Sequence, residues 1–111
     1  MADTFRITLG QLNPIVGDID GNIAKARAAW EAGRDAGADM VALPEMFAVG
    51  YNAQDLVMKP VFHETAIRAV EALAAECADG PALGIGAPLM DDGKLYNAYL
   101  ICKGARSPAG C

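Results

Sequence analysis

The sequence predicts a layered α/β fold, in which strands and helices alternate along the chain. Two patterns support this prediction: alternating apolar residues, which are typical of strands, and apolar residues at helical spacing, which are typical of amphipathic helices. The predicted order is β-α-β-α-β-β. Helices between consecutive strands imply parallel pairing through right-handed crossovers, and those helices must cover the sheet to bury their apolar faces.

The first strand, helix and second strand are predicted between residues 5 and 43. Residues 5–9 alternate apolar and polar side chains, as a strand does. Asn22 is placed to cap the helix that follows, and Gly37 is a natural stop for it. The helix has an apolar face made of Ile23, Ala26, Trp30 and Gly33. Residues 40–43 form a short continuous apolar run, which is typical of a strand buried on both faces.

The second half of the chain predicts one more helix and two more strands. Pro60 suits the first turn of a helix, where its missing N–H costs nothing. The buried stripe of that helix is Ala66, Val70, Leu73 and Cys77. Residues 83–89 read as a strand loosened by two glycines, and residues 95–102 read as the last strand. The intervening Asp91-Asp92-Gly93 is a turn signal, so these two strands should pair antiparallel.

Composition excludes several classes of partner. The 111-residue chain has a net charge of −5, which argues against binding to nucleic acid or to an anionic membrane. No segment has the roughly 18 consecutive apolar residues that a membrane span needs, and the N-terminus does not resemble a signal peptide. We therefore expect a cytoplasmic location. Three cysteines without metal-ligand spacing predict reduced thiols and no metal site.

Glu45 is the first candidate for chemistry. It follows a predicted buried strand directly, at the carboxyl end, where open α/β sheets bind ligands. A carboxylate that is partly shielded from water there can act as a general base near neutral pH. Its position is equally compatible with a solvated carboxylate at a strand end. Other candidates are weaker: Cys77 should be a buried structural thiol, Cys102 ends a strand, and His63 should lie on the surface.

Several segments together resemble the nitrilase (carbon–nitrogen hydrolase) superfamily. They are Gln11-Leu12-Asn13-Pro14, Gly17-Asp18, Asn22, Gly37-Ala38-Asp39, Leu43-Pro44-Glu45 and Gly50-Tyr51. Within the superfamily, residues 11–18, 50–56 and 96–98 are most similar to the glutaminase domain of glutamine-dependent NAD synthetases. Residues 50–56 depart from that family's pattern, because the family more often has prolines and a glutamate in this segment. The resemblance implies the N-terminal part of a nitrilase-like α-β-β-α sandwich, with residues 1–104 as a partial domain.

The resemblance also implies a chemistry. The family uses a Glu-Lys-Cys triad to release ammonia from glutamine, and only the glutamate maps onto this chain, as Glu45. Tyr51 would border the glutamine pocket, although a packed aromatic at the base of a loop is an equal interpretation. The family's ammonia passes to a synthetase domain that needs ATP and Mg²⁺, and full-length members form homo-oligomers. No cofactor is expected in this chain itself.

Other interpretations stay open at this stage. The chain could belong to a stand-alone amidase or carbamoyl hydrolase of the same superfamily, or be a non-catalytic α/β interaction module. Residues 105–111 are irregular, which we interpret as a truncation or frameshift, the alternative being a frayed terminus. With one triad residue the chain should be inactive alone. A partial sandwich should also expose apolar strand faces and an unpaired edge, which favours self-association.

Overall fold

The computed structural model describes residues 4–50 and 59–103 of the chain. Its elements are β1 (Ile7–Leu9), α1 (Ile19–Asp35), β2 (Met40–Ala42), α3 (Pro60–Glu76), β3 (Ala82–Asp91) and β4 (Lys94–Cys102). The predicted order β-α-β-α-β-β is therefore confirmed. Tyr51 and residues 105–111 lie outside the described residues, so what the sequence predicts for them stays a prediction.

The strands form one four-stranded sheet in the order β1-β2-β3-β4. The pairs β1–β2 and β2–β3 are parallel, and the hairpin β3–β4 is antiparallel, as the sequence predicts. The hairpin turns at Asp92 and Gly93, whose φ angles are 50° and 76°. Positive φ at both central residues is the requirement of a type I′ turn, which matches the twist of the flanking strands.

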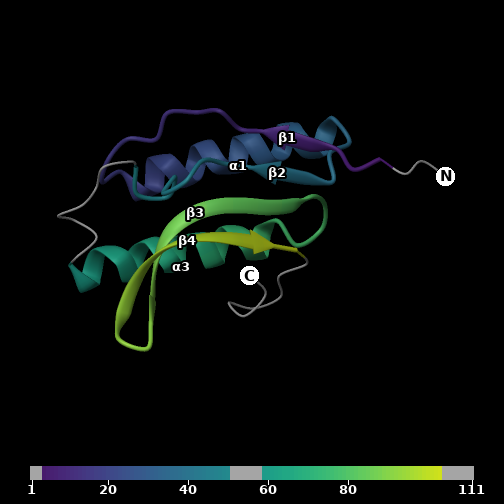
Figure 1. Cartoon of the computed structure of the whole chain (residues 1–111). Coiled ribbons are helices and arrows are strands. Elements are labelled where there is room, and N and C mark those ends of the chain that lie inside the picture. The colour runs from purple at the N-terminus through teal and green to yellow at the C-terminus, as the bar shows by residue number, and fades with distance from the viewer. Residues whose placement is uncertain (1–3, 51–58, 104–111) are drawn as a thin grey trace.

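Both helices cover the same face of the sheet (Figure 1). The core lies between them and that face, and its members include Ile23, Ala26, Trp30, Val41, Val70, Leu73, Leu83 and Ile85. Within the described residues, no helix is long and apolar enough to span a membrane.

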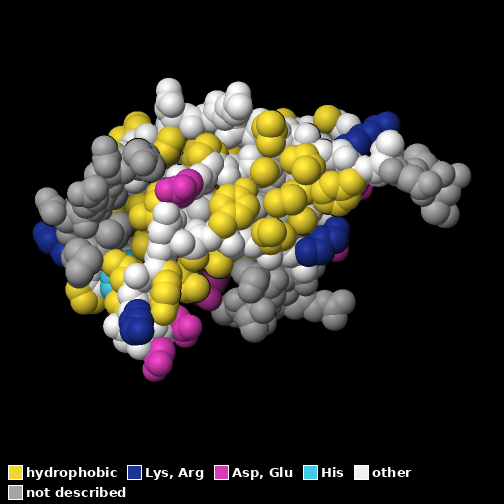
Figure 2. Space-filling model, in the orientation of Figure 1, with side chains coloured by type: hydrophobic (Ala, Val, Ile, Leu, Met, Phe, Trp, Pro, Cys, Tyr) yellow, Lys and Arg dark blue, Asp and Glu magenta, His cyan; other side chains and the backbone are white. Residues whose placement is uncertain are grey.

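The other face of the sheet has no helix over it. The large apolar side chains exposed there include Phe5, Ile7, Leu9, Tyr99 and Ile101. Figure 2 shows hydrophobic side chains gathered across this face. The expectation of an exposed apolar strand face is therefore confirmed. The expectation that residues 40–43 are buried on both faces is wrong for β2, because Val41 is fully buried while Met40 and Ala42 are half-buried.

Helix α1 begins differently from the sequence prediction. Asp18 is the capping residue, and its Oδ1 accepts a hydrogen bond from the Gly21 N–H at 3.0 Å. Asn22 lies inside the first turn, so its assignment as the cap is wrong. The helix ends at Asp35, and Gly37 follows with a φ of 81°, a conformation that favours glycine.

Helix α3 begins at Pro60 and buries the predicted stripe, with Cys77 as its C-terminal cap. His63 is only 4% exposed, so the prediction of a surface histidine is wrong. The physical reason is tertiary: the long β3–β4 hairpin extends alongside the first turns of α3, where Leu89 and Met90 line the same small cavity as His63. Sequence spacing within the helix carries no information about that hairpin.

Candidate functional site

Glu45 lies where the sequence predicts it, just beyond the carboxyl end of β2. The path of β2 continues to Leu43, whose N–H donates to the Gly84 carbonyl oxygen at 2.8 Å. The chain then turns at residues 45–49, and Met46 has a positive φ of 53°. The Glu45 side chain is exposed on the outside of this turn.

The turn that carries Glu45 is fastened to β3 through Gly86. The Gly86 N–H donates to the Pro44 carbonyl oxygen at 3.3 Å, and the Gly86 carbonyl accepts from the Ala48 N–H at 3.1 Å. A Cβ on Gly86 would meet the backbone N of Met46 and would lie 2.8 Å from the Cα of Glu45. Only glycine permits this approach, so β3 holds the backbone under Glu45 directly.

Asn22 fixes the same turn from the side of α1. Its amide Nδ2 donates to the carbonyl oxygens of Ile15 at 2.9 Å and Ala48 at 3.2 Å, and its Oδ1 accepts from the Ile15 N–H at 2.7 Å. The side chain is fully buried. Sequence analysis missed this role, although a signal existed: Asn22 falls on the apolar stripe of α1, four residues before Ala26, where an uncompensated amide would be costly.

Strand β4 supplies two side chains that act on the Glu45 region. Asn97 Nδ2 donates to Glu45 Oε1 at 3.0 Å, and the Tyr99 hydroxyl donates to the carbonyl oxygen of Leu43 at 2.9 Å. Burial raises the pKa of Tyr99 above its usual value, so the phenol stays a neutral donor at physiological pH. One residue thus contacts the carboxylate and the other contacts the backbone two residues before it.

A hollow of about 220 Å³ adjoins the turn at the carboxyl ends of β1 and β2. Its lining is Leu9, Gly10, Gln11, Ala42, Leu43 and Pro44. Pro44 directly precedes Glu45 in the chain, but Glu45 itself is not among the lining residues. The proton acceptor of this region is the Glu45 carboxylate, to which the Asn97 amide donates.

The cysteines of the described region lie away from Glu45. Cys102 pairs with Leu83, which in turn pairs with Val41, four residues before Glu45. Four residues of strand span roughly 13 Å, so Cys102 is near the opposite end of the sheet. The expectation of reduced thiols is wrong for Cys102, which is disulfide-bonded. Cys77 is buried, and burial raises the pKa of its thiol to about 12, which confirms a structural thiol.

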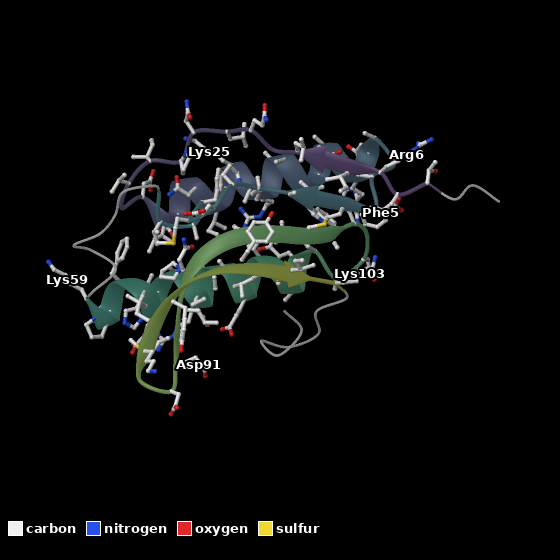
Figure 3. All side chains as sticks on the ribbon, in the orientation of Figure 1. Phe5, Arg6, Lys25, Lys59, Asp91 and Lys103 are labelled. Atoms are coloured by element: carbon white, nitrogen blue, oxygen red, sulfur yellow. The ribbon has the colours of Figure 1, made fainter. Side chains whose placement is uncertain are left out.

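Lys103 also lies at the far end of the sheet. Figure 3 shows it near Phe5, two residues before β1, and its Nζ donates to the Gly80 carbonyl oxygen at 2.7 Å. It therefore cannot meet a substrate held against Glu45. Within residues 4–50 and 59–103, no three His, Cys, Asp or Glu side chains gather in a way that could hold a metal ion.

Comparison with known proteins places this geometry in a family. The family model described as carbon-nitrogen hydrolase matches residues 6–107. A glutamine-dependent NAD(+) synthetase from Rhodobacter capsulatus is 59% identical over 106 residues, which is 96% of this chain and 19% of the relative. The corresponding synthetase from Thermotoga maritima is 43% identical over 58 residues, covering 52% of this chain and 10% of the relative.

Solved structures agree with the sequence relatives. The crystal structure of a glutamine-dependent NAD(+) synthetase from Cytophaga hutchinsonii superimposes with a TM-score of 0.86 at 28% identity, covering 95% of this chain and 18% of that one. An amidase from Nesterenkonia sp. shares the fold with a TM-score of 0.77 at 18% identity, covering 93% of this chain and 40% of that one. The matched part of the chain spans between 10% and 19% of the length of these synthetases. It belongs to the carbon–nitrogen hydrolase family, as a partial match to the N-terminal part of glutamine-dependent NAD(+) synthetases.

Proposed function

We infer that this chain supplies the general base of a glutamine amidohydrolase that provides ammonia for NAD synthesis. The observation that carries the proposal is the placement of Glu45. Its carboxylate stands at the carboxyl end of β2, on a turn fastened by Gly86 and Asn22, and Asn97 donates to it at 3.0 Å. The 59% identity to a synthetase supports glutamine as the substrate.

In this reaction Glu45 accepts the proton of a cysteine thiol. A neutral thiol is a poor nucleophile and an amide is a poor electrophile, so the proton must leave before the sulfur attacks the glutamine carboxamide. A lysine and a backbone N–H stabilise the oxyanion, each donor being worth about 3–4 kcal/mol. The proton that Glu45 accepted passes to the departing nitrogen, so that ammonia leaves, and water then releases glutamate from the thioester. The proposal assigns neither of these two roles to a lysine or a cysteine of the described residues.

The rest of the proposal concerns the intact enzyme. Tyr51 borders the glutamine pocket, and the released ammonia reaches a synthetase domain that uses ATP and Mg²⁺. This chain needs no cofactor of its own, and the full-length protein is a homo-oligomer. The 111-residue chain by itself releases no ammonia from glutamine, because removing one member of a catalytic unit typically abolishes most of its rate.

A chimera tests the role of Glu45. Residues 6–103 of this chain replace the matching segment of the Rhodobacter capsulatus synthetase, to which the chain is 59% identical over 106 residues. NAD formation is then measured with glutamine and, separately, with ammonium as the nitrogen source. The expected result is that the chimera uses both sources, whereas its Glu45→Gln variant uses only ammonium.

The ammonium reaction shows that each variant is folded, and Glu64→Gln is the matched control. Glu64 is an exposed carboxylate on α3 with no hydrogen bond in the described part of the chain, so its loss should leave both activities unchanged. Glutamine-dependent synthesis that survives Glu45→Gln would refute the assignment.

A further inference from the structure

Asn97 and Glu45 come from distant parts of the chain, 52 residues apart, and meet on the open face of the sheet. Asn97 lies on β4 opposite Pro88, and Tyr99 lies two residues further on, opposite Gly86. Residues two apart on a strand share a face, so both side chains project to the same side. That side is also the one on which Glu45 stands.

The side chains of β4 must cross β3 to reach the end of β2, and the glycines of β3 leave that path clear. A Cβ on Gly84 would lie 2.7 Å from the Tyr99 hydroxyl oxygen and 2.6 Å from the Met40 methyl carbon. Gly86 similarly leaves room for the Glu45 turn. The sequence suggests that the two glycines loosen the strand, and the structure gives them a different role. They allow β4 to contact the residues that follow β2.

The two contacts restrict Glu45 at different levels. Tyr99 holds the carbonyl oxygen of Leu43, so it fixes the backbone that leads into the turn. Asn97 holds one carboxylate oxygen and leaves the other, Oε2, without a hydrogen bond from the described residues. An exposed glutamate otherwise samples several rotamers, each of which would place its oxygens elsewhere. An amide donor on one oxygen selects the rotamer and leaves Oε2 to accept a proton.

We propose that Asn97 is a positioning residue that orients the Glu45 carboxylate for proton transfer. This proposal rests on the proposed function, because it assigns to Asn97 a role only if Glu45 is the base. Asn97 does not itself exchange a proton, since a neutral amide does not titrate and here only its Nδ2 donates a hydrogen bond to Glu45. Its effect is expressed through the geometry of Glu45, and so through the rate of the chemical step rather than through binding of glutamine.

The test uses the same chimera with the variants Asn97→Ala and Asn97→Asp. Asn97→Ala removes the donor, and the glutaminase kcat should fall about 10- to 100-fold with KM changed less than about threefold, because misplacement of a catalytic group slows chemistry by such factors. Asn97→Asp keeps the shape but replaces the donor by a second carboxylate 3.0 Å from Glu45, so its kcat should fall at least as far near neutral pH.

Asn97→Asp should also show a pH signature that a purely structural role would not produce. As the pH falls, protonation of the new carboxyl restores a donor to Glu45, so the ratio of variant to parent kcat should rise. Asn13→Asp is the matched control, because Asn13 is exposed and its side chain has no hydrogen bond in the described part of the chain. Ammonium-dependent synthesis reports whether each variant is folded.

The outcomes separate the two proposals. If Glu45→Gln abolishes glutamine use while Asn97→Ala keeps a kcat within twofold of the parent, the positioning role is overturned and the general base stands. If Glu45→Gln leaves glutamine use intact, the proposed function itself fails. A fall in kcat for both Asn97 variants, with KM and ammonium use preserved, supports the positioning role.

Discussion

At the scale of single residues, the sequence identifies Glu45 but none of the partners that hold it. Leu43-Pro44-Glu45 follows an apolar run, and that local pattern suffices to place a carboxylate at a strand end. Asn97 and Gly86 lie 52 and 41 residues after Glu45 in the chain, and strand pairing brings them to it. The register of that pairing cannot be predicted from local hydrophobic periodicity. The role of Asn22 is equally hidden from the sequence. An asparagine near the start of a helix predicts a cap, and only the structure shows that its amide bonds to Ile15 and Ala48.

The buried amide of Asn22 carries a prediction about stability. Asn22→Ala leaves the N–H of Ile15 and the carbonyl of Ala48 without their partner, whereas the carbonyl of Ile15 keeps the hydrogen bond from the Asp18 N–H at 3.1 Å. Each unsatisfied buried group costs about 1–3 kcal/mol, so the free energy of unfolding should fall by roughly 2–4 kcal/mol. Trp30 is the sole tryptophan and is 4% exposed, so its fluorescence can follow urea unfolding in dilute solution.

Asn13→Ala is the matched control, since that exposed side chain has no hydrogen bond in the described residues, and its effect should stay within about 0.5 kcal/mol. Equal midpoints for Asn22→Ala and the parent would show that the Asn22 bridge contributes nothing to the fold.

At the scale of elements, the spacing of apolar residues and the positions of glycine and proline predict all six helices and strands of the described region. The 3.6-residue stripes of α1 and α3 and the turn before β4 are strong local signals, and the structure follows them. What the patterns cannot supply is which face of a strand is covered. Residues 5–9 alternate as a half-buried strand does, yet Ile7 and Leu9 point to the uncovered face. The alternation of β1 is therefore predicted correctly from the sequence, whereas the exposure of its apolar side chains is not.

The contact between α1 and α3 gives a prediction about pH. Arg27 Nε and Nη2 donate to the two carboxylate oxygens of Glu76 at 2.8 and 2.9 Å. Hydrogen bonding from Arg27 lowers the pKa of Glu76 below its ordinary value of 4.5. A carboxyl whose pKa is lower in the folded state stabilises the fold above pH 4.5, and this contribution is lost as the pH falls through the folded pKa.

Both side chains are well exposed, at 40% and 51%, so the pair should contribute only about 0.5 kcal/mol. The change in unfolding free energy across this pH window should therefore be smaller in Glu76→Gln than in the parent, by about 0.5 kcal/mol. Glu64→Gln, on the exposed side of the same helix, should retain the parent's dependence. An identical pH dependence in Glu76→Gln and the parent would contradict the linkage.

At the scale of the whole molecule, the described residues form a two-layer structure with one apolar face uncovered. The family's fold is a sandwich of two sheets, and the matched part of the chain spans between 10% and 19% of the length of these synthetase relatives. Large apolar side chains such as Leu9 at 65% exposure and Ile101 at 57% therefore stand without a covering layer in the described structure. Such a surface, bordered by strand edges, favours association with other copies.

Self-association should respond to charge placed on that face. Leu9→Lys with Ile101→Lys puts two charges on the uncovered face, and sedimentation velocity should show a larger monomer fraction than for the parent chain. Val61→Lys is the matched control, because Val61 is 78% exposed but lies on α3. An unchanged distribution in the double variant, or an equal shift in the control, would mean that this face does not drive association.

The most direct test of the central claim is the formation of the thioester in the chimera. After rapid mixing with glutamine, mass spectrometry measures the fraction of the nucleophilic cysteine that is acylated at each time. If Glu45 is the general base, Glu45→Gln should slow acylation by several orders of magnitude while ammonium-dependent synthesis continues. Acylation of the variant at the parent's rate would contradict the account, because another group would then be removing the thiol proton.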